Sequence, residues 1–129
     1  MLAIYLTAIA HQVGVSGAIL LSICTVESGM RNINTFNDPH SGSFGVCSIN
    51  LRTARSIKPY ADRLALQQPT FNIEIAALYL KKHMNKYKNK WNAVAAYNAG
   101  HVTIADGIYS NQIYVDKVKK VYGRLAYGI

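Results

Sequence analysis

Glycines that follow apolar stretches divide this chain into short helical segments. Gly14 follows the apolar N-terminal stretch, and Gly29 follows a second stretch that Ser16 is placed to cap. Gly100 follows a third segment of helical character at residues 91–99. No part of the sequence shows the strict alternation of apolar and polar residues that a half-buried strand requires. These helix-end signals, without a competing strand pattern, predict a mainly α fold.

A long polar segment at residues 29–50 interrupts the helical pattern. It is rich in Asn, Ser and Gly, and a loop of this length in a compact domain usually has a function. After it, the sequence predicts short helical pieces at 51–57 and 60–66, a helix at 73–87 capped by Asn72, and helices at 91–99 and 112–126. We expect one compact helical domain over residues 1–129, with an irregular or slightly β middle.

The composition indicates a globular domain with an anionic partner. The chain has 129 residues, of which 50% are hydrophobic and 16% charged, and 14 Lys and Arg face six Asp and Glu to give a net charge of +8. The apolar run at 13–26 is shorter than a bilayer needs, so no membrane span is expected. No secretory signal is expected either, because the first basic residue is Arg31.

Neither the histidines nor the cysteines have the spacing of a metal site, so no metal or cofactor is expected. Cys24 and Cys47 are too few for a disulfide scaffold, and small buried cysteines are common in protein cores. The sequence therefore favours two buried thiols. The alternative is a disulfide between Cys24 and Cys47, which would brace the segments around them.

Glu27 is a carboxylate in an apolar stripe. Leu20, Ile23, Cys24 and Glu27 follow the i, i+3, i+4, i+7 spacing of one helix face. Glu27 also lies in the last turn before Gly29, where the helix dipole disfavours an anion. Burial and the dipole would both raise its pKa, as a general acid requires. A side chain that turns to solvent at a frayed helix end is the alternative interpretation.

Several short motifs, in this order, resemble the soluble lytic transglycosylase catalytic domain of the goose-type lysozyme-like superfamily. They are VESG at 26–29, GVCSI at 45–49, NIEIAALYL at 72–80, AAYNAG at 95–100 and YVDKV at 114–118. The resemblance covers nearly the whole chain and implies an α+β lysozyme-like fold. It also implies cleavage of the MurNAc-β-1,4-GlcNAc bond of peptidoglycan with formation of 1,6-anhydromuramic acid ends.

The resemblance assigns the chemistry to Glu27 as the single general acid/base. The same motifs imply a substrate-binding cleft with eight further residues: Ser28, Gly45, Val46, Cys47, Ser48, Tyr97, Asn98 and Tyr114. Ser48 stands where the family usually has a glutamine, and its shorter side chain would reach a sugar only through water. The GVC form of this motif resembles bacteriophage members of the family.

Two other functions remain open. Asp38, in the polar loop, is a possible second carboxylate that would activate water and make the protein a hydrolytic muramidase. A non-catalytic glycan-binding or virion structural protein on the same fold is the other.

The lysine-rich stretch at 81–90, which also contains Tyr87, resembles a nucleic-acid patch, but no nucleic-acid motif accompanies it. An anionic cell-wall surface suits the same charge, so we expect a monomer that binds peptidoglycan rather than nucleic acid. Without a signal peptide, it would act on the wall from a virion or after release from the host cytoplasm.

Overall fold

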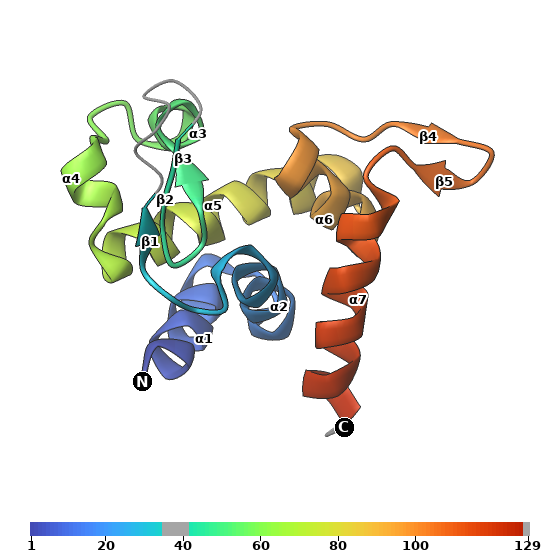
Figure 1. Ribbon diagram of the computed structural model, residues 1–129, viewed down its shortest axis with the longest axis horizontal. Coiled ribbons are helices and arrows are strands. Elements are labelled where there is room, and N and C mark those ends of the chain that lie inside the picture. Colours follow the sequence, from blue (N-terminus) through green and yellow to red (C-terminus); the bar gives the residue numbers. More distant parts are fainter. Residues whose placement is uncertain (35–41, 128–129) are drawn as a thin grey trace.

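Helices dominate the protein in a computed structural model that describes residues 1–34 and 42–127 (Figure 1). The helices are α1 (Leu2–Val13), α2 (Gly17–Ser28), α3 (Leu51–Ile57), α4 (Arg63–Leu66), α5 (Pro69–Tyr87), α6 (Lys90–Ala99) and α7 (Gln112–Tyr127). The strands are β1 (Ile33–Asn34), β2 (Ser43–Gly45), β3 (Ile49–Asn50), β4 (Ile104–Ala105) and β5 (Ile108–Tyr109). The predicted fold class, mainly α with a small β middle, is confirmed.

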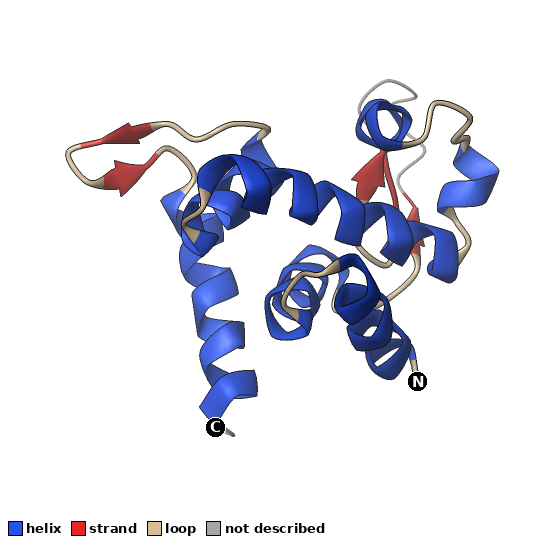
Figure 2. Ribbon diagram, turned by 180° about the vertical axis from the view of Figure 1, so that it is seen from behind, coloured by secondary structure: helices blue, strands red, loops and turns tan. Residues whose placement is uncertain are grey.

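The long helix α5 runs across the molecule, with α1 and α2 packed on one side of it and α7 packed against α2 (Figure 2). Strands β1, β2 and β3 form an antiparallel sheet in that order, with Phe44 paired to Asn34 on one side and Ile49 on the other. Fully buried aliphatic side chains such as Leu6, Ile23 and Leu80 fill the core between the helices. No described helix is long and apolar enough to cross a membrane.

The predicted helix ends are confirmed where glycine carries the signal. Gly14, Gly29 and Gly100 adopt left-handed backbone with φ of 89°, 68° and 85°, and each closes its helix with a backbone hydrogen bond. Ser16 caps α2 as expected, because its side chain accepts a hydrogen bond from the Ile19 amide.

The prediction that Asn72 caps the long helix is wrong. Helix α5 begins at Pro69, a residue preorganised for the first helical turn, so Asn72 already lies inside the helix and is fully buried. The second short helical piece is also shorter than predicted, since α4 starts only after Asp62, which caps it through the Ala65 amide. The β4–β5 hairpin was not predicted, although Asp106-Gly107 at its turn is a hairpin signal.

The buried amide of Asn72 holds three backbone segments together. Its Nδ2 donates to the carbonyl oxygens of Phe44 at 2.6 Å and Leu66 at 2.9 Å, and its Oδ1 accepts from the Cys47 amide at 2.8 Å. Gly45 makes this approach possible, because a Cβ there would lie 2.2 Å from the Asn72 Nδ2 and the backbone has φ of 81°. The amide thereby fixes the end of β2, the turn after it and the end of α4.

Cys24 and Cys47 form a disulfide, so the preference for two free thiols is wrong. The Cα atoms lie 4.4 Å apart because α2 packs directly on the turn after β2, a contact between segments 23 residues apart in the chain. Sequence spacing does not report such a contact. The bond joins the helix that carries Glu27 to the turn that Asn72 holds.

Replacing Asn72 by Ala should lower the free energy of unfolding by about 2–4 kcal/mol, because one buried amide and two carbonyls lose their partners. Urea denaturation monitored by circular dichroism measures this loss. Asn85→Ala is the matched control, since Asn85 lies on the same helix but is exposed. Equal unfolding midpoints for the two variants would contradict the role given to Asn72.

Reduction of the disulfide should lower the free energy of unfolding by about 3 kcal/mol, the value expected for a loop of this length. The measurement is the denaturation midpoint with and without a thiol reductant. The Cys24→Ala, Cys47→Ala double variant serves as the control, because its midpoint should not respond to the reductant. An unchanged midpoint of the parent protein after complete reduction would show that the bond is not stabilising.

Candidate active site

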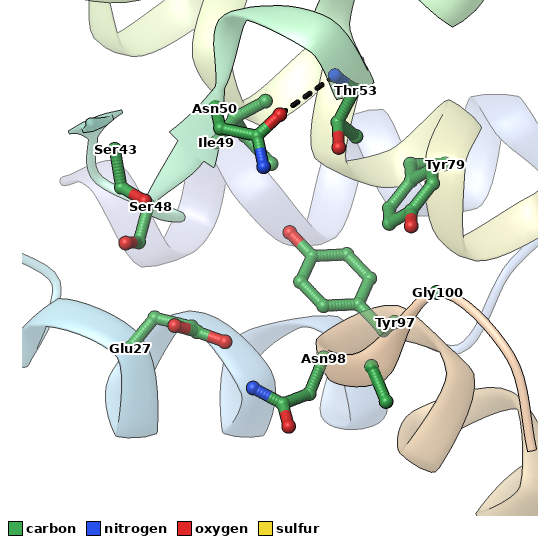
Figure 3. Close-up of a pocket in the computed structure, with 11 residues that line it drawn as sticks. Glu27, Ser43, Ser48, Ile49, Asn50, Thr53, Tyr79, Tyr97, Asn98 and Gly100 are labelled. Carbon is green, nitrogen blue, oxygen red and sulfur yellow. Dashed lines mark hydrogen bonds between the residues drawn. The ribbon is translucent and has the colours of Figure 1, made fainter. Parts of the chain in front are cut away.

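Glu27 occupies the last turn of α2 and is half-buried (Figure 3). Leu20, Ile23 and Cys24 on the same helix face are fully buried, so the carboxylate extends an interior stripe as the sequence predicts. The alternative of a side chain turned to solvent at a frayed helix end does not describe this arrangement, because Glu27 is half-buried and lines a cavity. Gly29 then closes the helix through its amide on the Thr25 carbonyl.

Burial raises the pKa of Glu27 above its ordinary value. The buried Tyr114 hydroxyl opposes this in part, because its interaction with the carboxylate lowers the pKa of Glu27. Burial also raises the pKa of Tyr114 and of Tyr97, so both phenols stay neutral beside the acid. The surroundings therefore favour a protonated carboxyl group at a higher pH than in water.

A cavity of about 260 Å³ opens on one side of Glu27. Figure 3 shows Glu27 and Asn98 below it, Tyr97 in the middle, and Ser48 and Asn50 above. The lining comes from α2, the β2–β3 segment, α3, α5 and α6: Glu27, Ser43, Ser48, Ile49, Asn50, Thr53, Tyr79, Tyr97, Asn98, Ala99 and Gly100. Hydroxyl and amide groups dominate this wall, so it can exchange hydrogen bonds with a hydroxyl-rich ligand.

A second cavity of about 680 Å³ also has Glu27 in its wall. It is lined by Val26 and Glu27 from α2, by residues 108–114, and by Lys117. The start of α7 and the β4–β5 hairpin form this wall, which sequence reasoning did not identify apart from Tyr114. Among the described residues, Glu27 is the one that the walls of these two cavities share.

The predicted substrate-binding residues divide into two groups. Ser48, Tyr97 and Asn98 line the first cavity, and Tyr114 lines the second. The other four lie beneath the cavity surface and line neither: Ser28, Gly45, Val46 and Cys47 are all buried.

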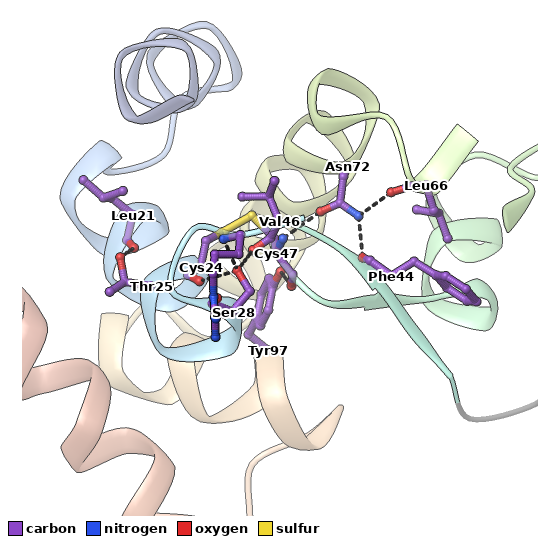
Figure 4. Close-up of a disulfide and its surroundings, with 11 residues drawn as sticks. Leu21, Cys24, Thr25, Ser28, Phe44, Val46, Cys47, Leu66, Asn72 and Tyr97 are labelled. Carbon is purple, nitrogen blue, oxygen red and sulfur yellow. Dashed lines mark hydrogen bonds between the residues drawn. A yellow bond between two sulfur atoms is a disulfide. The ribbon is translucent and has the colours of Figure 1, made fainter. Parts of the chain in front are cut away.

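The four residues beneath the surface hold the cavity-lining residues in place. The Ser28 hydroxyl donates to the Val46 carbonyl and accepts from the Arg31 amide at 3.1 Å, which adds to the disulfide between α2 and the turn (Figure 4). The Tyr97 hydroxyl contacts the Cys47 carbonyl at 3.4 Å. After this turn Ser48 adopts left-handed backbone with φ of 54°, and its side chain reaches the cavity.

Several lining residues were missed by the sequence analysis. Asn50 caps α3 through the Thr53 amide at 2.8 Å, and both residues face the first cavity. Asn111 donates to the Asn98 side chain at 2.9 Å and to the Ala95 carbonyl at 3.0 Å, which orients Asn98 from the second cavity. The capping pattern before residues 51–57 was a signal for Asn50, whereas nothing local marked Asn111.

The other described carboxylates line neither of the two cavities. Glu74 pairs with Lys58, Asp62 caps α4, Asp116 accepts from Gln112, and Asp106 is exposed at the hairpin turn. Asp38 lies outside the described residues. Within residues 1–34 and 42–127, Glu27 is thus the one acidic residue that lines either of these two cavities, and no group of three His, Cys, Asp or Glu there is arranged to hold a metal ion.

Comparison with known proteins identifies the family of this chain. Residues 4–118 match the family described as the transglycosylase SLT domain. Protein IpgF of Shigella flexneri is 30% identical over 93 residues, and protein IpgF of Shigella sonnei is 28% identical over 93 residues. Each alignment covers 70% of this chain and 61% of the relative, so the chain spans about three fifths of the length of these relatives. The family match covers almost all of the described residues, and the chain belongs to the transglycosylase SLT domain family.

Proposed function

We propose that this protein is a lytic transglycosylase that cleaves the MurNAc-β-1,4-GlcNAc bond of peptidoglycan and leaves 1,6-anhydromuramic acid ends. The observation that carries the proposal is the position of Glu27, whose carboxyl group has a raised pKa and which lines both cavities. A glycan strand that occupies both cavities places a glycosidic bond at this carboxyl group. Membership of the transglycosylase SLT domain family supports the reaction type.

In the proposed mechanism, Glu27 acts twice. Its protonated form donates a proton to the glycosidic oxygen, the C–O bond breaks, and the GlcNAc hydroxyl leaves as an oxocarbenium-like centre forms on the muramic acid. The Glu27 carboxylate then accepts the proton of the muramic acid 6-hydroxyl, whose oxygen bonds to the anomeric carbon. The ring closes and the carboxyl group regains its proton. The reaction therefore consumes no water and needs no second carboxylate.

We assign positions around this step from the walls of the two cavities. Ser48, Tyr97 and Asn98 would hold the sugar in the first cavity, and Asn111 would keep the Asn98 amide in place. Tyr114 would remain a neutral phenol beside the acid and adjust its pKa. Ser28, Cys24 and Cys47 would position the acid through the backbone.

The place of action and the phage relationship remain proposals. We propose that the protein acts on the bacterial wall as a bacteriophage-type enzyme, delivered by a virion or released from the host cytoplasm. A search for this chain among the proteins of purified phage particles tests that location.

Replacing Glu27 by Gln should reduce the release of soluble fragments from purified peptidoglycan by about 10²- to 10⁴-fold, because the amide cannot donate or accept the proton. Mass spectrometry of fragments from the parent protein should show anhydromuramic ends, one water lighter than hydrolytic ends. Glu74→Gln is the matched control, since Glu74 lies outside both cavities. Reducing muramic ends would instead assign hydrolysis, and undiminished release by the Glu27 variant would remove the acid from its role.

The pH dependence of kcat/KM should carry the signature of a raised carboxyl pKa. Because the first step needs a protonated Glu27, activity should fall as the pH rises through that pKa. Tyr114→Phe removes the hydroxyl that lowers the pKa, so its alkaline limb should shift to higher pH. Tyr60→Phe, at an exposed position away from both cavities, should leave the limb in place. A limb that stays fixed or shifts to lower pH in Tyr114→Phe would contradict this assignment.

A further inference from the structure

Lysines and aromatic rings gather where α5 ends, α6 begins and α7 passes. Lys90 lies 5.6 Å from the centre of the Trp91 ring and 5.0 Å from that of Tyr122. Lys119 lies 5.3 Å from the Trp91 ring centre, and the two rings meet edge to face at 5.5 Å. We call this group the lysine–aromatic cluster; with Lys86, which lies over Tyr87, it comprises Lys86, Tyr87, Lys90, Trp91, Lys119 and Tyr122.

The cluster is strongly cationic. The sequence has no Asp or Glu from residue 75 to residue 105, whereas it has five lysines between 81 and 90. Lys86, Lys90 and Lys119 are exposed, and within the described parts of the chain none of them forms an ion pair. The field reaches the core as well: burial first, and then Lys82 and Lys86, lower the pKa of His83 to about 4.

Lys90 lies at a helix end that is unfavourable for a positive charge. It is the first residue of α6, where the helix dipole is positive and disfavours a cation. The Trp91 and Tyr122 rings offset this cost by attracting the ammonium group. The charge is therefore held at the surface by rings and not neutralised by a carboxylate, which suits an anion supplied from outside the chain.

The chemistry of the cluster favours a polymer with repeated carboxylates. Lysine attracts anions as a point charge and lacks the bidentate fork of arginine, so the cluster suits many weak contacts along a polymer more than one specific pairing. Nucleic acid is disfavoured because the Trp91 ring, which would have to stack on a base, is half-buried and already contacted by Lys90 and Lys119. The peptide side chains of peptidoglycan carry carboxylates at every repeat of the strand.

We propose that the lysine–aromatic cluster is an accessory docking surface for the peptide carboxylates of peptidoglycan. This inference rests on the proposed function. Helix α6 carries Asn98 at the first cavity and Trp91 in the cluster, roughly 10 Å apart along its axis. A polymer whose glycan enters the cavities can therefore present its peptide carboxylates to the cluster, which strengthens binding without touching the reacting atoms.

The test is co-sedimentation with insoluble peptidoglycan in the Glu27→Gln background, where the polymer stays intact. One sample of peptidoglycan is native, and the other has its carboxyl groups converted to amides. The triple change Lys86→Gln, Lys90→Gln and Lys119→Gln should weaken binding to native peptidoglycan by about ten-fold and leave binding to the amidated polymer unaltered. The difference should shrink as salt is added.

Two controls separate charge from folding. The triple Lys→Arg change at the same positions keeps the charge and the ring contacts, and should retain binding. Arg52→Gln, an exposed change on α3, should weaken binding less than the single Lys90→Gln change.

The inference would be overturned if the Glu27→Gln protein with its three lysines intact bound native and amidated peptidoglycan equally. It would also be overturned if the triple Lys→Gln change left binding to native peptidoglycan unaffected. Tighter binding to duplex DNA than to native peptidoglycan at the same salt would overturn it in favour of nucleic acid. Failure of the proposed function has a separate signature. It would appear as absent or hydrolytic products in the mass spectra of the active protein, which this binding measurement does not use.

Discussion

The buried amide of Asn72 is the contact on which the cavity wall depends. Its three hydrogen bonds end on backbone groups of Phe44, Cys47 and Leu66, so one side chain fixes segments that have little regular structure of their own. The short strands of this region cannot hold a turn rigidly by themselves. Gly45 leaves room for the Asn72 amide because it has no Cβ, and the disulfide then fixes Cys47 to Cys24 on α2. The helix that carries Glu27 is thereby joined to the cavity wall by the disulfide and by the Ser28 hydrogen bond to the Val46 carbonyl.

Local signals predicted the elements whose ends are set locally. Gly14, Gly29 and Gly100 end helices because a left-handed residue costs glycine little, whatever surrounds it. The role of Asn72 could not be predicted, because asparagine suits both a helix cap and a buried amide. Only the packing of β2 against α5 decides between the two roles. The disulfide was misjudged for a related reason, since two small buried cysteines give the same pattern whether or not they meet.

The site could be predicted in part. A carboxylate in an apolar stripe before a terminal glycine was visible in the sequence, and the structure shows Glu27 half-buried at the same place. Which residues of a motif face the cavity was not visible, because Cys47 and Ser48 are neighbours in the chain yet lie on opposite sides of its surface. The wall formed by residues 108–114 was missed apart from Tyr114, because it depends on how α7 packs against α2.

The packing of α2 against α7 also bears on the order in which the molecule is made. Glu27 leaves the ribosome before α3 to α6, whereas Tyr114 and the β4–β5 hairpin follow only after those helices have been synthesised. Contacts between segments so distant in sequence form late, because a long loop must close before they can be made. A nascent chain thus holds its acid without the second cavity beside it until α7 has been synthesised.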